Sequence, residues 1–198
     1  MGEAKFMDSL RLFIAISLPL TIKENLARLQ KNLQASGANV KWVESKNFHL
    51  TLKFLGETPK TKCKPITRAI EEVGKAFSSF ELKITNLGTF PSRGRPKVVW
   101  AGLGGNGGQL VSLQASLEQK LAHLGFAPEN RKYSPHLTLG RVKEFGTLGD
   151  LTDRINQYKN ENNDIWKVEA IELIQSTLTP SGPVYHVLSI VPLKMNPV

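Results

Sequence analysis

The tetrapeptide His-Leu-Thr-Leu occurs twice in the chain, at His49–Leu52 and again at His136–Leu139. Because side chains alternate between the faces of a strand, each copy would place its imidazole and hydroxyl on one face and its leucines on the other. The leucine faces need an apolar layer to pack against. The repeat therefore predicts two rigid strands that aim two imidazoles at a common space, an arrangement suited to paired acid and base catalysis.

Each copy follows a similar order of predicted elements. A strand over 10–17 and a helix over 21–35 precede the motif strand at 49–55, and a strand over 97–101 and a helix over 109–124 precede the one at 136–142. The remaining expected elements are a short strand at 40–43, a helix over 65–77, a strand over 80–87, a short helix over 151–158 and a closing hairpin of strands 168–177 and 184–191.

These elements predict an α+β fold with two similar lobes of antiparallel sheet, outer helices and a central cleft, the lobes being related by pseudo-two-fold symmetry. Each lobe would supply a central strand that carries one motif. The composition is 40% apolar and no low-complexity linker divides the chain. We therefore expect residues 1–198 to form a single bilobal domain.

The net charge of +9 comes from 26 basic and 17 acidic residues spread along the whole length. This balance favours a polyanionic partner, but it distinguishes neither RNA from DNA nor catalysis from binding.

Cys63 is the only cysteine, so an intramolecular disulfide is excluded and a reducing cytoplasm is expected. The apolar run over 12–20 is too short to span a bilayer, and it contains Ser17 and Pro19. We expect a cytoplasmic monomer without a membrane role.

The extended motifs His-Leu-Thr-Leu-Lys-Phe at 49–54 and His-Leu-Thr-Leu-Gly-Arg at 136–141 resemble the HxTxxF and HxTxxR motifs of the two-histidine (2H) phosphoesterases. Segments 11–16, 97–102 and 134–141 are also similar to the RNA 2′,3′-cyclic phosphodiesterases of that superfamily, also called 2′-5′ RNA ligases. The resemblance spans nearly the whole chain, and it implies the 2H phosphoesterase fold.

The resemblance implies hydrolysis of a terminal 2′,3′-cyclic phosphate on RNA to a 2′-phosphate, without a metal or a cofactor. His49 would be the general acid toward O3′, and His136 would be the general base for water. An imidazole suits either role because its ordinary pKa lies near neutral pH. The sequence itself does not decide which histidine is which. Ligation would be the reverse transesterification, with a ribose hydroxyl in place of water.

The same resemblance implies four substrate-binding residues. Thr51 and Thr138 would hydrogen-bond phosphate oxygens, Arg141 would offer a bidentate contact, and Phe54 would stack on the terminal base.

Strict alternation conflicts with two of these roles, because Phe54 and Arg141 lie at an odd offset from their histidines. It would place Lys53 and Gly140 on the histidine face instead. We therefore predict a bulge, a twist or a strand end near these positions. Lys53 is a secondary candidate for phosphate contact, beside the alternative of a solvated lysine.

Several alternatives stay open. Each motif is also consistent with the plain polar face of a half-buried strand. His123 is expected near a helix end and His186 outward on the last hairpin. The glycine pattern over 102–107 fits a flexible turn better than a dinucleotide-binding loop, because the acidic residue of such a fold is missing.

The cationic segment over 93–97 fits either a surface loop or a funnel for the RNA backbone. Trp42, Trp100 and Trp166 are expected in the core rather than as stacking platforms. No His-Glu-x-x-His motif supports a metallohydrolase.

Two rival functions follow from the same residues. The first is a non-catalytic RNA-binding protein, and the second is a two-histidine enzyme that acts on small cyclic nucleotides. A nicotinamide-dependent enzyme ranks third. The physiological RNA, and the balance between hydrolysis and ligation, are not determined by the sequence.

Overall fold

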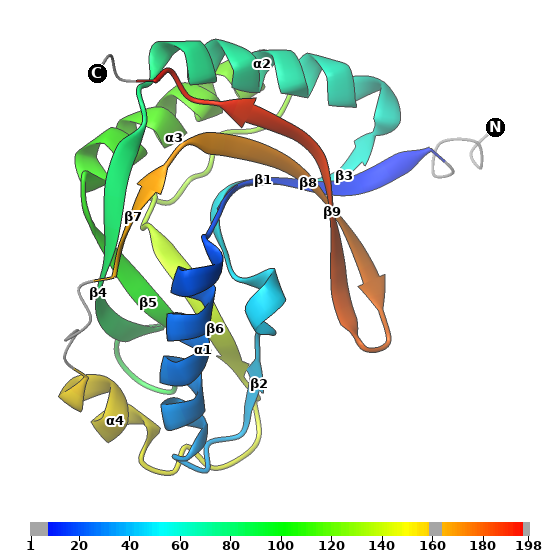
Figure 1. The fold of residues 1–198 in the computed structure, drawn as a ribbon. Helices are drawn as coiled ribbons and strands as arrows, with labels where there is room; N and C mark the ends of the chain where they lie inside the picture. Colours follow the sequence, from blue (N-terminus) through cyan, green and yellow to red (C-terminus); the bar gives the residue numbers. More distant parts are fainter. Residues whose placement is uncertain (1–7, 159–163, 196–198) are drawn as a thin grey trace.

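The computed structural model describes residues 8–158 and 164–195 of the 198-residue chain. Two antiparallel sheets carry helices on their outer sides (Figure 1). The strands are β1 (Ser9–Ser17), β2 (Val40–Trp42), β3 (His49–Pro59), β4 (Phe80–Phe90), β5 (Val98–Gly105), β6 (His136–Val142), β7 (Ile165–Val168), β8 (Ala170–Thr179) and β9 (Gly182–Pro192). The helices are α1 (Leu20–Gln34), α2 (Cys63–Ala76), α3 (Gly107–Ala122) and α4 (Leu151–Gln157), with 3-10 turns η1 (Ser45–Asn47) and η2 (Lys60–Lys62).

The two motif strands lie in different sheets. One sheet has the order β3-β1-β8-β9, and the other has the order β2-β6-β5-β4-β7. Helices α2 and α3 pack on the first sheet, and α4 packs on β4 of the second and against α1. The predicted pair of antiparallel sheets with outer helices is confirmed.

One detail of the prediction was wrong. Strand β3 lies at an edge of its sheet rather than at the centre. The central strands are β1 and β8, because β8 pairs with the side of β1 that faces away from β3. Each sheet also mixes strands from both halves of the chain: β8 and β9 join β1, whereas β2 and β4 lie in the sheet of β6. Hydrophobic periodicity identifies a strand but carries no information on its distant partner, so neither feature was visible in the sequence.

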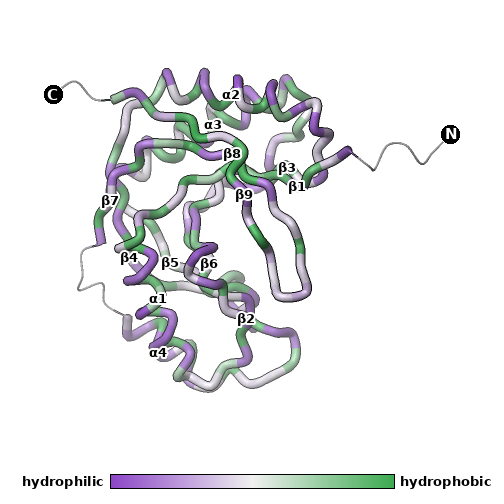
Figure 2. The backbone as a smooth tube through the Cα atoms, turned by 45° about the vertical axis from the view of Figure 1, so that its right-hand side comes forward, coloured by the Kyte–Doolittle hydropathy of each residue, from purple (hydrophilic) through white to green (hydrophobic). Residues whose placement is uncertain are grey.

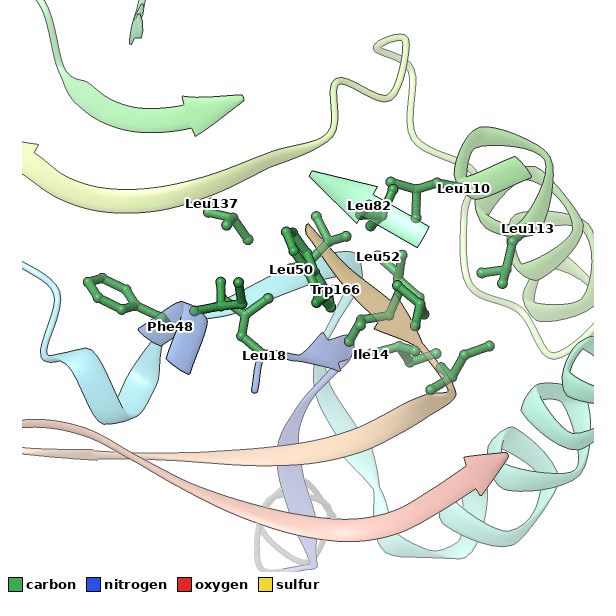
Figure 3. Packing of buried hydrophobic residues seen from close by; sticks show 14 of the residues in the cluster. Ile14, Leu18, Phe48, Leu50, Leu52, Leu82, Leu110, Leu113, Leu137 and Trp166 are labelled. Carbon is green, nitrogen blue, oxygen red and sulfur yellow. The ribbon is translucent and has the colours of Figure 1, made fainter. Parts of the chain in front are cut away.

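The leucines of both motifs are buried, as predicted. Leu50, Leu52, Leu137 and Leu139 are at most 2% exposed. One hydrophobic cluster joins them to residues of both sheets and of the covering helices (Figure 3). Each buried leucine side chain contributes about 1.5–3 kcal/mol to folding, so both motif strands are anchored firmly from behind.

The hairpin of β8 and β9 extends away from the rest of the molecule (Figure 1). In the view turned by 45°, α2 alternates between hydrophilic and hydrophobic residues along its length (Figure 2). That alternation agrees with the buried stripe of α2, which includes Ile66, Ile70 and Val73. Within residues 8–158 and 164–195, no helix has the length and apolar character needed to cross a bilayer.

Candidate active site

The imidazoles of His49 and His136 are held in the same way. Each Nδ1 lies 2.7 Å from the carbonyl oxygen of the residue two positions earlier, Asn47 or Ser134. Because a carbonyl oxygen only accepts hydrogen bonds, Nδ1 is the protonated nitrogen in both rings. The neutral ring then leaves Nε2 as an acceptor, and protonation of the ring makes the same atom a donor. Each histidine is thus prepared to move a proton through Nε2.

Aromatic side chains fix the planes of both rings. The ring of His49 packs 4.8 Å from that of Phe13 and lies edge-on to Tyr185 at 5.4 Å, measured between centroids. The ring of His136 lies edge-on to Phe90 at 5.1 Å. These contacts restrict ring rotation, which preserves the direction of each Nε2.

Burial lowers the pKa of His49 below its ordinary value, because the protonated ring loses solvation. The Asn47 carbonyl opposes this shift by accepting a hydrogen bond from the ring, and the positive charge of Lys23 adds to it. The neutral form of His49 is therefore favoured in the protein without substrate.

A β-bulge in β3 turns Phe54 to the motif face. Thr51 and Lys53 pair with consecutive residues of β1, so Leu52 is the extra residue. Leu52 and Lys53 are both buried and Phe54 is 62% exposed, which shifts the alternation by one position. Phe54 therefore joins His49 and Thr51 on one face, and the predicted bulge is confirmed.

The second motif strand has a matching bulge. Thr138 and Gly140 pair with consecutive residues of β5, so Leu139 is the extra residue and Arg141 emerges on the exposed side. Gly140 is required here because a Cβ at this position would lie 2.5 Å from Cγ1 of Val40. A bulge, a twist or a strand end was predicted near this glycine, and the bulge at Leu139 confirms it.

A cleft of about 680 Å³ contains five of the six predicted site residues. His49, Thr51 and Phe54 of β3 line it, together with Thr138 and Arg141 of β6. His136 is not among its lining residues, but it stands two positions before Thr138 at the start of β6, and β3 and β6 lie against each other. The roles of all six residues remain predictions.

Several residues that line the cleft were not predicted from the sequence. Arg11 and Lys41 add positive charge to it, and Tyr185 of the hairpin lines it beside His49. Burial raises the pKa of the Tyr185 hydroxyl, while the positive charges of Arg11 and Arg141 act in the opposite direction. Arg11 lies in one of the segments that carry the family resemblance, whereas Tyr185 had no signal beyond the alternation of its strand.

Two further residues support the motif strands from outside the repeat. The side-chain amide of Asn47 donates to the carbonyl of Pro183 at 3.1 Å, so Asn47 contacts the hairpin as well as His49. The hydroxyl of Tyr133, just before the second motif, donates to the carbonyl of Thr51 at 2.9 Å. This bond links the segment that leads into β6 to the first motif strand.

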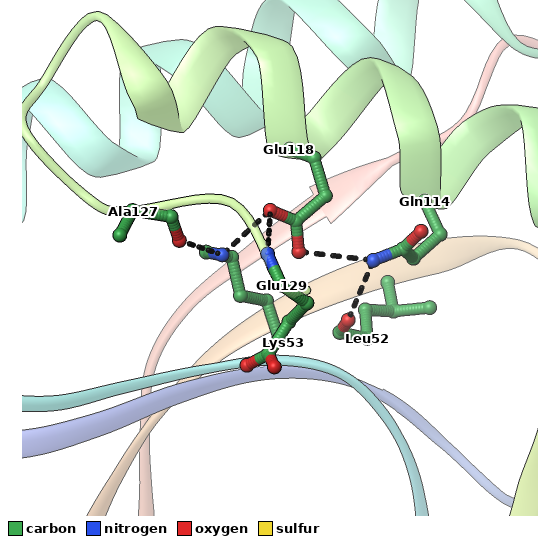
Figure 4. Close-up of polar contacts among 6 residues, drawn as sticks. All are labelled: Leu52, Lys53, Gln114, Glu118, Ala127 and Glu129. Atoms are coloured by element: carbon green, nitrogen blue, oxygen red, sulfur yellow. Dashed lines mark hydrogen bonds and ion pairs between the residues drawn. The ribbon is translucent and has the colours of Figure 1, made fainter. Parts of the chain in front are cut away.

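Lys53 is not a phosphate ligand, which corrects its status as a secondary candidate. Its side chain is 2% exposed, and its Nζ lies 2.6 Å from Oε2 of Glu118 and donates to the Ala127 carbonyl at 2.9 Å (Figure 4). Gln114 donates to the other carboxylate oxygen of Glu118 and, at 3.4 Å, to the Leu52 carbonyl. The bulge that exposes Phe54 is thus the reason that Lys53 faces α3.

The other sequence patterns lie away from the cleft or have a structural role. Residues 102–105 continue β5 and α3 begins at Gly107, so the glycine pattern forms a strand end rather than the predicted flexible turn. His123 Nδ1 donates to the Gln119 carbonyl at the end of α3, and His186 is exposed, both as predicted. Arg95 donates to the carbonyls of Lys143 and Gly146, which fixes a surface loop.

Trp166 is buried in the core, as predicted, whereas Trp42 packs against the core and also lines the cleft. Over the described ranges, no group of three or more histidine, cysteine or acidic residues is arranged to hold a metal ion.

Comparisons with known proteins agree with this architecture. The family model described as LigT like Phosphoesterase matches residues 16–100 and 105–185. A relative from Methanocaldococcus jannaschii, named RNA 2′,3′-cyclic phosphodiesterase, is 39% identical over 179 residues that cover 90% of this chain and 98% of the relative. The crystal structure of Escherichia coli LigT in apo form is 28% identical with a TM-score of 0.77, over 94% of this chain and 99% of that one. The structure of that protein complexed with 3′-AMP has a TM-score of 0.78 at 26% identity and the same coverage. The predicted fold class is confirmed.

Proposed function

Because the chain belongs to the LigT-like phosphoesterases, we propose that it hydrolyses the terminal 2′,3′-cyclic phosphate of RNA to a 2′-phosphate, with His49 and His136 as the catalytic residues. The description of the family and the names of the relatives both support phosphoesterase activity. The specific substrate is supported by relatives from several archaea at 35–39% identity, all named RNA 2′,3′-cyclic phosphodiesterase.

The observation that carries the proposal is the matched hydrogen bonding of the two imidazoles, each held at Nδ1 by a backbone carbonyl so that Nε2 is left for proton transfer. Neutral His136 takes a proton from water through Nε2 as the water oxygen attacks phosphorus. Protonated His49 gives its Nε2 proton to O3′ as the bond between phosphorus and O3′ breaks. The products are a 2′-phosphate and a free 3′-hydroxyl. His136 has taken up one proton and His49 has given up one.

The remaining cleft residues suit the substrate end. Thr51 and Thr138 supply hydroxyl donors for the phosphate oxygens, and the Arg141 guanidinium stabilises the charge that develops on them. The exposed ring of Phe54 offers a stacking face for the terminal base.

The lowered pKa of His49 has to be reconciled with its role as the acid. A phosphate anion placed beside the ring favours the imidazolium form and raises that pKa. Substrate binding would therefore supply the electrostatic condition under which His49 carries its proton. The free protein favours the neutral ring because burial and Lys23 act without an opposing anion.

Two proton-transfer groups complete the reaction, so we propose that it needs neither a metal nor a cofactor. The same site would run the reverse transesterification when a ribose 5′-hydroxyl takes the place of water, which forms a 2′-5′ linkage. We further propose a cytoplasmic monomer in which residues 1–198 act as one bilobal domain. The buried cluster shared by both sheets supports the single domain.

The test is an RNA oligonucleotide that ends in a 2′,3′-cyclic phosphate, incubated with the purified protein in excess EDTA. Chromatography against 2′-phosphate and 3′-phosphate standards should identify a 2′-phosphate end. His49→Ala and His136→Ala should each reduce the rate by about 10²–10⁴-fold, with the melting temperature retained. A 3′-phosphate product, loss of activity in EDTA or wild-type rates in either variant would contradict the proposal. Salt-sensitive RNA binding without turnover would instead indicate the non-catalytic alternative.

A further inference from the structure

A second cleft, of about 380 Å³, is also lined by His49. It shares His49, Asn47 and Tyr185 with the larger cleft, so the two meet at one of the proposed catalytic residues. We propose that this second cleft binds the nucleotide that precedes the terminal one in an RNA strand. The inference rests on the proposed function and extends it to the length of the substrate.

The charge of the second cleft suits a phosphodiester. Lys23 Nζ donates to the Lys46 carbonyl at 3.1 Å, and the Lys46 ammonium pairs with Glu44 at 2.7 Å. Among the residues with described positions, Lys23 has no carboxylate partner. Its positive charge nevertheless acts on His49, and both residues line this cleft, so Lys23 stands near one of the two proposed catalytic residues. An internucleotide phosphate one step from the cyclic phosphate would neutralise it.

The walls of the second cleft suit a nucleobase. Ile174 and Val187 supply apolar surface. Glu172 is 8% exposed, and one of its oxygens accepts a hydrogen bond from the Ser17 hydroxyl at 2.5 Å. The carboxylate is therefore held in place as an acceptor for an amino group of a base. A volume of about 380 Å³ also lies within the range of roughly 300–1,000 Å³ that is usual for small-molecule sites.

The covalent structure of ribose decides which nucleotide enters this cleft. O3′ is bonded to C3′, which neighbours C4′, and C4′ leads through C5′ and O5′ to the preceding phosphate. O2′ is bonded to C2′, which neighbours C1′ and the base. If His49 protonates O3′, the preceding nucleotide leaves the ribose on the side of His49. The terminal base then points away from it, into the larger cleft that Phe54 lines.

The proposal predicts a preference for oligonucleotides over mononucleotides. The experiment compares kcat/KM for a nucleoside 2′,3′-cyclic phosphate with that for a dinucleotide ending in the same group, using the full chain. A third substrate carries a neutral methylphosphonate at the internucleotide linkage. We expect the dinucleotide to be favoured by about tenfold, mainly through KM, and the methylphosphonate to lose most of that advantage.

Variants then locate the preference. Lys23→Ala should lower the ratio of kcat/KM for the dinucleotide to kcat/KM for the mononucleotide by roughly 3- to 10-fold. When the methylphosphonate replaces the dinucleotide in this ratio, Lys23→Ala should have little effect. Using the ratio removes any change that the altered pKa of His49 imposes on both substrates. Val187→Glu places a negative charge in the cleft and should act in the same direction. Lys75→Ala removes an exposed charge from α2 and serves as the matched control, with the ratio unchanged.

Equal kcat/KM for both substrates in the wild type, or an unchanged ratio in Lys23→Ala and Val187→Glu, would overturn the second cleft as a nucleotide site and leave the proposed function intact. Absence of hydrolysis with every substrate would overturn the proposed function, and this inference with it.

Discussion

At the scale of single residues, His49 and His136 share one hydrogen-bond geometry in unequal surroundings. Both rings are held through Nδ1 by carbonyls at 2.7 Å, but the pKa shift of His49 arises from burial and from Lys23. Burial and Lys23 favour the neutral His49 ring in the free protein, so the acid role proposed for His49 depends on the anion that the substrate brings.

The pKa of His49 gives a direct prediction. In an NMR titration of the free protein, the His49 imidazole should lose its proton at a pH below the ordinary value near 6.5. Lys23→Ala removes a positive charge that disfavours imidazolium, so it should raise this pKa. Saturating inorganic phosphate should raise it as well, because an anion favours the charged ring. The protonated fraction at neutral pH should therefore increase in both cases. A pKa that does not move with phosphate would remove the explanation of how His49 carries a proton during catalysis.

The motif residues could be predicted because a repeated tetrapeptide, strand alternation and the family resemblance all point to them. Tyr185, Lys41 and Lys23 could not be predicted as residues beside His49 or its cleft. They come from three other elements, and their proximity depends on tertiary packing that no local pattern encodes. Lys53 was misassigned because its position on the histidine face holds only in a regular strand.

At the scale of secondary-structure elements, the two bulges determine what the motif strands present. An odd offset between histidine and Phe54 or Arg141 required a break in alternation, and the break occurs at Leu52 and Leu139. The sequence thus predicted the irregularity. It did not predict the edge position of β3, because β8 reaches β1 from the far end of the chain.

The buried ion pair behind β3 predicts a large stability effect. Glu118→Ala would leave the Lys53 ammonium buried without its carboxylate, and it would remove one of the two acceptors of the Gln114 amide. We expect the free energy of unfolding to fall by about 3–5 kcal/mol in urea denaturation, the usual cost of breaking a buried pair from one side.

Glu72→Ala is the matched control for this variant. Glu72 pairs with Lys120 across α2 and α3, but both side chains are about half exposed, so solvent already screens their attraction. Its denaturation midpoint should match the wild type. Equal midpoints for Glu118→Ala and Glu72→Ala would show that the Lys53 pair does not anchor the bulged strand.

At the scale of the whole molecule, catalysis as proposed depends on two sheets that each contribute one motif strand. The chain passes between the sheets several times, so the sheet of β3 includes C-terminal strands and the sheet of β6 includes early ones. A shared hydrophobic cluster then fixes their relative position. The net charge of +9 favours a polyanionic partner for the molecule as a whole, whereas in the proposed function the choice of substrate depends on the clefts beside His49.

The central claim is that two imidazoles from separate sheets act on one phosphoryl group in one reaction. A double-mutant cycle of His49→Ala, His136→Ala and the combined variant, with kcat measured on RNA that ends in a cyclic phosphate, tests it most directly. Residues that act as a unit give strongly non-additive losses, so the combined variant should be slower than the weaker single variant by no more than about tenfold. Losses that multiply, with each histidine contributing its full factor independently of the other, would contradict the claim.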